Sequence, residues 1–144
     1  GVVIGENDKI ICTASDYNTI SILDDSSHEP LVISPSNLAP LDSPEGVDVD
    51  GKGNLFICAD NGLWKMNLKD GIIPKICTSA NTRGGYLCCS FESVYFFTCP
   101  HLFRFFTDSK DLVKLKLDSP LVSPKGLAYN QGYLYFPDGN CIKK

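Results

Sequence analysis

A strand-rich repeat with a period of about 40 residues is the feature that most constrains the fold of this chain. The segment SPEG at residues 43–46 opens one copy and SPKG at residues 123–126 opens another, so that their glycines lie 80 residues apart. Fainter copies begin at Gly1 and Gly85. Repeats of this length, built from short strands, are typical of the blades of a β-propeller. The units expected are 1–40, 41–80, 81–120 and an incomplete one at 121–144.

Short strands separated by tight turns are expected within each unit. The turns carry Gly, Asn and Asp, as in DGKGN at residues 50–54, and these residues tolerate positive φ or bond their own backbone. The runs LFIC (55–58), VYFF (94–97) and LYF (134–136) lack polar alternation, which predicts burial on both faces between neighbouring blades. Nine prolines and twelve glycines, scattered along the chain, argue against a long helix. We therefore expect an all-β fold, a propeller arc of about three and a half four-stranded blades.

Charge and hydropathy exclude two classes of partner. The net charge of −4 and the isoelectric point near 5.0 argue against nucleic acid, because attraction to phosphates needs clustered Lys and Arg. The basic pairs Lys114/Lys116 and Lys143/Lys144 are short and are expected on solvated faces. No apolar run approaches the roughly 18 residues that span a bilayer, so no membrane span is expected.

Seven cysteines cannot all pair within one chain. Most of them fall in strand-like apolar runs, where Cys behaves as a small hydrophobic residue: Cys12, Cys58, Cys77, Cys88 and Cys89. Reduced, buried thiols are the favoured interpretation, and with them an intracellular location. The alternative is a secreted protein with some disulfides, for instance at Cys99 or Cys141 near turns.

The sequence SPEGVDVDGKGNLFICADNGLWKMNL, at residues 43–68, resembles a blade of the superfamily that contains NHL repeats, strictosidine-synthase-like proteins and the gluconolactonase (regucalcin) group. Residues 120–143 match less closely, and residues 1–24 and 83–106 match only in pattern. The resemblance implies a six-bladed ring, of which this arc would be a part. It says little about activity, because one fold hosts many functions.

The resemblance also points to a candidate metal site. In the gluconolactonase group, the residue between Pro and Gly lies at the mouth of the central channel and holds a divalent cation. The corresponding residues here are Glu45, Gly84 and Lys125. Glu45 is the candidate calcium ligand, whereas Gly84 has no side chain and Lys125 carries the wrong charge. An ion pair between Glu45 and Lys125 is therefore expected in place of a metal site built by this chain alone, although missing blades would be able to supply further ligands.

The leading functional hypothesis is a non-catalytic interaction or scaffold module. An incomplete ring leaves an apolar blade face at each end, which predicts a protein partner or a second copy of the chain to complete it. Aromatic residues concentrate in the third unit, and Phe103, Phe105 and Phe106 are candidates for a partner-facing surface if they are not ordinary core residues. Two alternatives stay open: a calcium-dependent hydrolase of the lactonase or esterase type, and a secreted propeller that binds a ligand.

Overall fold

The all-β prediction is confirmed by the structure, a computed structural model that describes residues 1–24, 29, 31–33, 41–67, 75–77, 85–98 and 100–144. These residues form fifteen strands and no α-helix, with two short 3-10 turns at Glu6–Asp8 and Ser15–Tyr17. The strands make four antiparallel sheets, three with four strands and one with three. Within the described ranges, no helix is long and apolar enough to cross a membrane.

Each sheet is one blade, and its strands follow one another in chain order. Blade 1 contains β1 (Val2–Ile4), β2 (Ile10–Ala14), β3 (Thr19–Leu23) and β4 (Leu31–Ile33). Blade 2 contains β5 (Val47–Val49), β6 (Asn54–Ala59), β7 (Gly62–Asn67) and β8 (Lys75–Cys77). Blade 3 contains β9 (Leu87–Cys89), β10 (Ser93–Thr98), β11 (His101–Phe106) and β12 (Leu112–Lys114). Blade 4 contains β13 (Ala128–Asn130), β14 (Tyr133–Asp138) and β15 (Cys141–Lys143).

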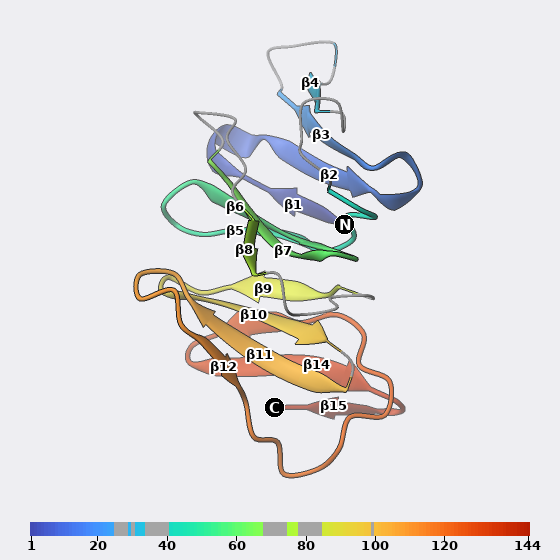
Figure 1. The fold of residues 1–144 in the computed structure, drawn as a ribbon, viewed down its shortest axis with the longest axis vertical. Coiled ribbons are helices and arrows are strands. Elements are labelled where there is room, and N and C mark those ends of the chain that lie inside the picture. The colour runs from blue at the N-terminus through green and yellow to red at the C-terminus, as the bar shows by residue number, and fades with distance from the viewer. Residues whose placement is uncertain (25–28, 30, 34–40, 68–74, 78–84, 99) are drawn as a thin grey trace.

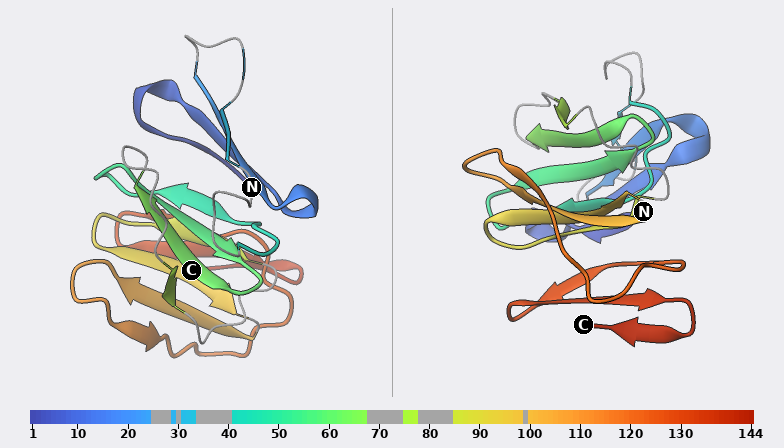
Figure 2. Two further views of the ribbon diagram at one scale, coloured as in Figure 1. Left: turned by 45° about the horizontal axis from the view of Figure 1, so that its top comes forward. Right: turned by 60° about the horizontal axis from the view of Figure 1, so that its bottom comes forward.

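The four blades stack face to face in chain order, from the blue blade 1 at the top of Figure 1 to the red blade 4 at the bottom. Two further views show the blades from other angles, with blade 1 (blue) at the top of the left view and blade 4 (red) at the bottom of the right view (Figure 2). The first strands of successive blades are neighbours: β1 contacts β5, β5 contacts β9, and β9 contacts β13. These first strands therefore form the inner edge of the arc, as in a propeller.

Three hydrophobic clusters fill the spaces between blades. The first joins blades 1 and 2 and includes Ile11, Ile20, Leu55, Trp64 and Met66. The second joins blades 2 and 3 and includes Phe56, Leu63, Leu87, Phe96 and Phe105. The third joins blades 3 and 4 and includes Phe97, Leu102, Leu121 and Phe136. Burial of apolar area between sheets is thus the main force that holds the blades together.

The predicted burial of the apolar runs is confirmed in blades 2 and 3 but is only partly correct in blade 4. Residues 55–58 and 94–97 are buried throughout, as expected of strands covered on both faces. In blade 4, Phe136 is buried, but Leu134 and Tyr135 keep part of their surface exposed. Blade 4 contacts blade 3 on one side, and no described blade covers its other side.

Lys143 departs from the expected solvated face. Its Nζ lies 2.6 Å from Oδ2 of Asp138, whose side chain is fully buried. The Asp138 Oδ1 atom accepts hydrogen bonds from the N–H groups of Val122 and Ser123, at 2.9 and 2.7 Å. The hydrogen bond to Lys143 holds the pKa of Asp138 below its ordinary value despite desolvation, and the two backbone bonds act in the same direction. The pair fastens the loop before blade 4 to strands β14 and β15.

Candidate functional site

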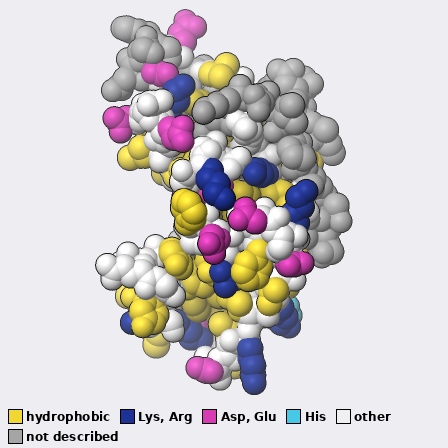
Figure 3. Space-filling model, turned by 90° about the vertical axis from the view of Figure 1, so that its left-hand side faces the viewer, with side chains coloured by type: hydrophobic (Ala, Val, Ile, Leu, Met, Phe, Trp, Pro, Cys, Tyr) yellow, Lys and Arg dark blue, Asp and Glu magenta, His cyan; other side chains and the backbone are white. Residues whose placement is uncertain are grey.

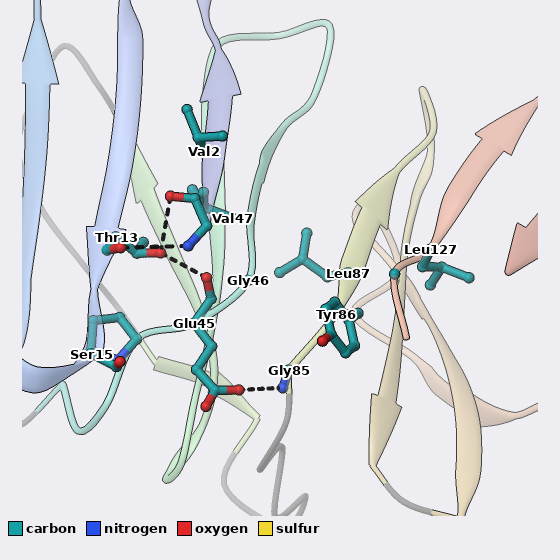
Figure 4. A pocket seen from close by; sticks show the side chains of 13 residues that line it. Val2, Thr13, Ser15, Glu45, Gly46, Val47, Gly85, Tyr86, Leu87 and Leu127 are labelled. Carbon is teal, nitrogen blue, oxygen red and sulfur yellow. Dashed lines mark hydrogen bonds between the residues drawn. The ribbon is translucent and has the colours of Figure 1, made fainter. Parts of the chain in front are cut away.

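A pocket of about 470 Å³ lies where the innermost strands begin, at the position expected for the mouth of a propeller channel (Figure 4). All four blades contribute to its lining, which includes Thr13, Glu45, Gly85, Tyr86 and Leu127. The described lining residues present mostly backbone and small or apolar side chains, and Glu45 is the one carboxylate among them. This is the surface on which the sequence placed its candidate metal ligand.

Glycine at two of these strand starts allows adjacent blades to approach closely. A Cβ atom on Gly46 would overlap the carbonyl oxygen of Gly85 in blade 3 and would lie 3.3 Å from the backbone nitrogen of Leu87. A Cβ atom on Gly1 would likewise overlap the carbonyl oxygen of Glu45. Gly126, at this position in blade 4, has a positive φ of 71°, and the nearest atom to its Cβ position would be 4.0 Å away. This close approach is therefore seen where blade 1 meets blade 2 and where blade 2 meets blade 3.

Glu45 connects three blades. Its Oε2 atom accepts a hydrogen bond of 2.9 Å from the N–H of Gly85 in blade 3, and its carbonyl oxygen accepts one of 2.7 Å from Oγ1 of Thr13 in blade 1 (Figure 4). Thr13 in turn donates its N–H to the carbonyl oxygen of Gly1, at 2.9 Å. Glu45 at the channel mouth therefore holds neighbouring blades together, a role that was not predicted from the sequence.

Asp48 makes a second bond of this kind. Its Oδ2 atom accepts the N–H of Cys89 in blade 3 at 2.7 Å, and its Oδ1 atom accepts the N–H of Val49 at 2.8 Å. Desolvation raises the pKa of Asp48, and these two hydrogen bonds oppose the rise. The sequence signal for this contact is a carboxylate between two valines in a short inner strand, and the contact itself was not predicted.

Lys125 occupies the position in blade 4 that Glu45 occupies in blade 2. The N–H of Glu45 donates to the carbonyl oxygen of Cys58 at 2.9 Å, and the N–H of Lys125 donates to that of Pro137 at 3.0 Å. Among the described residues, however, the Glu45 and Lys125 side chains form no ion pair, and the Glu45 Oε2 atom is bonded to Gly85 of blade 3. The expected pair is therefore absent from this structure, and Gly84 lies outside the described residues.

In blade 3, the backbone hydrogen bonds show that the repeat is shifted by one residue from the alignment on the glycines. The N–H of Phe97 donates to the carbonyl oxygen of Tyr86 at 3.2 Å, whereas in blade 2 the N–H of Cys58 donates to that of Gly46 at 2.9 Å. Tyr86 therefore occupies the place of Gly46. Gly85 occupies the place of Glu45 at the channel mouth, which alignment on the glycines assigns to residue 84.

The described residues alone do not form a calcium shell. Calcium takes six to eight oxygen ligands, and Glu45 offers one carboxylate whose Oε2 atom is already bonded to Gly85. A group of three or more His, Cys, Asp or Glu side chains suited to a metal is not found in the ranges that the structure describes. Calcium binding at Glu45 would thus depend on ligands from outside those ranges.

The three phenylalanines proposed as a partner surface have different surroundings. Phe105 is buried in the cluster between blades 2 and 3, and Phe103 is half-buried against the same cluster. Phe106 is half-buried, and the guanidinium carbon of Arg104 lies 4.0 Å from the centre of its ring. Of the three rings, those of Phe103 and Phe106 keep part of their surface exposed.

The five cysteines whose state the structure describes are free thiols: Cys12, Cys58, Cys88, Cys89 and Cys141. Burial, reinforced by the charge of Asp48, raises the pKa of Cys88 to about 12 and also raises that of Cys89. Thiols in such surroundings are poor nucleophiles. Cys99, one of the two suggested disulfide partners, lies outside the described residues.

A second candidate site is the side of blade 4 that faces away from blade 3. We call the side of a blade turned toward the following blade its front face. Matched strand pairing makes Tyr135, Pro137 and Ile142 the counterparts of the blade 2 residues Phe56, Cys58 and Leu63. Leu63 is 0% exposed because blade 3 covers it, whereas Ile142 is 80% exposed. The open front face comprises Tyr133, Tyr135, Pro137 and Ile142.

A lysine lies near an aromatic ring on the front face of both blade 2 and blade 4. Lys65 Nζ lies 5.8 Å from the ring centre of Phe56, and Lys144 Nζ lies 5.8 Å from that of Tyr135. Lys144 also lies over Tyr133, at 3.7 Å. Blade 4 therefore presents a surface with the same arrangement as one that blade 2 buries against its neighbour.

The opposite end of the arc has an open back face, the side that would meet a preceding blade. It comprises Val2, Ile4, Ile10 and Leu23 of blade 1, which are 67, 66, 43 and 41% exposed. Strand pairing makes them the counterparts of the blade 2 residues Val47, Val49, Leu55 and Met66. Leu55 and Met66 are almost fully buried against blade 1. A space-filling view of one side of the molecule shows hydrophobic side chains at the surface in its middle and lower part, interspersed with charged ones (Figure 3).

Comparison with solved structures establishes the class of fold. The chain superimposes on a streptogramin B lyase structure with a TM-score of 0.81 at 19% identity, over 98% of this chain and 49% of the lyase. It superimposes on virginiamycin B lyase from Staphylococcus aureus with a TM-score of 0.77 at 16% identity, over 99% of this chain and 53% of that one. The computationally designed Ika4 protein matches with a TM-score of 0.73 at 12% identity, over 99% of this chain and 86% of its own.

These likenesses show a partial β-propeller, in agreement with the superfamily that residues 43–68 resemble. The chain spans about half the length of the two lyases. No protein-family model and no curated protein sequence matches it. At these identities the comparisons speak to the fold and not to activity, and the six-bladed ring remains a prediction.

Proposed function

We propose that this chain is a non-catalytic interaction module, and that its function is to bind further propeller blades through its open front and back faces. The observation that carries the proposal is the contrast in exposure between equivalent residues. Leu63 and Ile142 hold the same position in blades 2 and 4, yet one is fully buried and the other is 80% exposed. Surfaces of this kind on monomers are commonly binding sites.

The chemistry of both open faces favours blades as the occupants. The front face offers two tyrosine rings, a proline and an isoleucine, and the back face offers four aliphatic side chains. The described blade interfaces are built from the same residue types, with little charge at their centres. Full burial of one such aliphatic side chain contributes about 1.5–3 kcal/mol.

A matched pair of substitutions tests the proposal. Ile142→Lys places a charge on the open front face, and Val122→Lys places one at a position that is 81% exposed. Val122 precedes Ser-Pro-x-Gly in blade 4, and its blade 2 counterpart, Asp42, stays exposed although both neighbouring blades are present. Val122 thus lies outside the surface that a neighbouring blade covers.

Both variants are compared with the unmodified chain by binding of an apolar fluorescent dye in dilute solution and by static light scattering in concentrated solution. We expect Ile142→Lys to lower dye binding and self-association, and Val122→Lys to leave both unchanged. Equal responses of the two variants would show that the open front face is not a docking surface.

A further inference from the structure

A pocket of about 350 Å³ lies at the outer edge of blade 3, where β11 begins and where the chain leaves β12. Its described lining consists of residues 100–102 and 114–121, all within the continuous range 100–144. Among the described residues, this lining has no member in common with the pocket at the channel mouth or with either open face. One blade and the segment that follows it therefore form this cavity.

Strand pairing places three basic side chains together at this pocket. Phe103 pairs with Lys114, and the next pair of residues is joined by a backbone hydrogen bond of 2.9 Å. Continuing this register sets Lys116 opposite His101. Because side chains alternate between the two faces of a strand, His101, Lys114 and Lys116 share one face.

Two of these basic groups are in direct contact. The Nζ atom of Lys114 lies 3.1 Å from Nε2 of His101, the distance of a hydrogen bond from an ammonium group to a neutral imidazole. The His101 ring also meets the ring of Phe103 nearly edge-on, with ring centres 6.3 Å apart. Neither Lys114 nor Lys116 forms an ion pair with a residue that the structure describes.

The pocket is cationic on a chain that is negatively charged. With His101 neutral, two lysines and one carboxylate, that of Asp118, give the pocket a net charge of +1, against −4 for the whole chain. Apart from Ser119, the other described lining residues are apolar: Pro100, Leu102, Leu115, Leu117, Pro120 and Leu121. A volume at the lower end of the usual range of about 300–1,000 Å³ suits a small ligand.

We infer that this pocket binds an organic carboxylate with a short apolar tail. The carboxylate accepts hydrogen bonds from the ammonium groups of Lys114 and Lys116, and the tail packs against Leu115, Leu117 and Pro120. A singly charged head group matches the net charge of the pocket, and the lining has no arginine fork of the kind that favours phosphate. This inference goes beyond the proposed function, which concerns the open faces of blades 1 and 4.

Isothermal titration calorimetry of the full chain with decanoate, below the concentration at which decanoate forms micelles, tests this site. Lys114→Gln and Lys116→Gln each remove one charge at an exposed position, so that folding should be preserved. Two controls are matched to them: Lys110→Gln, exposed on the same blade outside the pocket, and Lys144→Gln, beside the tyrosine rings of the open front face. We expect each pocket variant to weaken decanoate binding about tenfold and each control to change it by less than about twofold.

Inorganic phosphate and decanol separate the contributions of the head group and the tail. We expect decanoate to bind at least about tenfold more tightly than either probe. Equal binding of phosphate would show a site for any anion, and equal binding of decanol would show that the lysines take no part; each result overturns the inference.

Absence of decanoate binding would also overturn it. So would a loss of binding in Lys144→Gln that Lys114→Gln and Lys116→Gln do not share, because the ligand would then lie on the open front face. None of these results bears on the docking of blades, which the comparison of Ile142→Lys with Val122→Lys tests separately.

Discussion

Replacing Gly46 with alanine should separate blades 2 and 3. Gly46 has no positive φ, so alanine introduces no backbone strain of its own. The added Cβ would overlap the carbonyl oxygen of Gly85 and would approach the nitrogen of Leu87 to 3.3 Å. Both neighbours are backbone atoms, which cannot rotate away as a flexible side chain would. The blades must therefore move apart at their inner edge.

The size of the effect follows from what that movement breaks. Overpacking a well-packed interior typically costs about 1–3 kcal/mol. The upper end applies here, because separation of β5 from β9 also lengthens the bonds that Gly85 makes to Glu45 and Cys89 makes to Asp48. We expect a loss of about 3 kcal/mol in the free energy of unfolding, which corresponds to about 10 °C in Tm for a chain of this size.

Urea unfolding followed by circular dichroism measures this change, with Gly51→Ala as the matched control. A Cβ atom on Gly51 would lie 3.7 Å from Cδ2 of Phe91, an ordinary contact, so the control should stay within about 0.5 kcal/mol of the unmodified chain. If Gly46→Ala proves as stable as Gly51→Ala, the close approach of the two blades at this glycine is refuted.

Four further predictions concern metal, charge and thiols. Millimolar calcium should leave Tm unchanged; a rise in Tm that Glu45→Gln abolishes would instead favour the calcium-dependent hydrolase. In urea titrations from pH 6 to pH 2, the stabilisation that Asp138 contributes relative to Asp138→Asn should shrink as the pH falls below the ordinary 3.8, because its folded-state pKa is lowered. The contribution of Asp48 to the free energy of unfolding, relative to Asp48→Asn, should grow as the pH falls from its raised pKa toward 3.8, because desolvation disfavours its charged form. If stability changed with pH in the same direction for both carboxylates, these assignments would be contradicted. A thiol reagent should label the exposed Cys141 quickly and the buried Cys88 only on unfolding, as mass spectrometry of the labelled peptides would show.

The strands could be predicted from the sequence because their signals are local. Residues 55–58 lie within the strand Asn54–Ala59, and residues 134–136 lie within the strand Tyr133–Asp138. β-Branched and aromatic residues between Gly, Asn and Asp turns are sufficient for this, since each turn is specified by its own few residues.

Register between repeats could not be obtained in the same way. Alignment on the glycines places Gly85 opposite Gly46, whereas backbone pairing places Tyr86 there. A shift of one residue changes no local propensity. It is decided by which side chains reach the space between blades, and that depends on the neighbouring sheet.

Interactions between blades were the part of the site that sequence reasoning missed. The bond between Glu45 and Gly85, and the bond between Asp48 and Cys89, join segments that only the folded arc brings together. The open ends were foreseen from the incomplete repeat. Their composition was not, because identifying Ile142 as the counterpart of Leu63 requires the pairing of β14 with β15.

Hydroxyl-radical footprinting of the assembled protein tests the central claim most directly. In the isolated arc, Ile142 and Val122 are 80 and 81% exposed, but only Ile142 lies on the open front face. We predict that Ile142 and Tyr133 are strongly protected in concentrated solution, while Val122 stays as reactive as in dilute solution. Equal reactivity of Ile142 and Val122 at every concentration would contradict the claim that this face binds another blade.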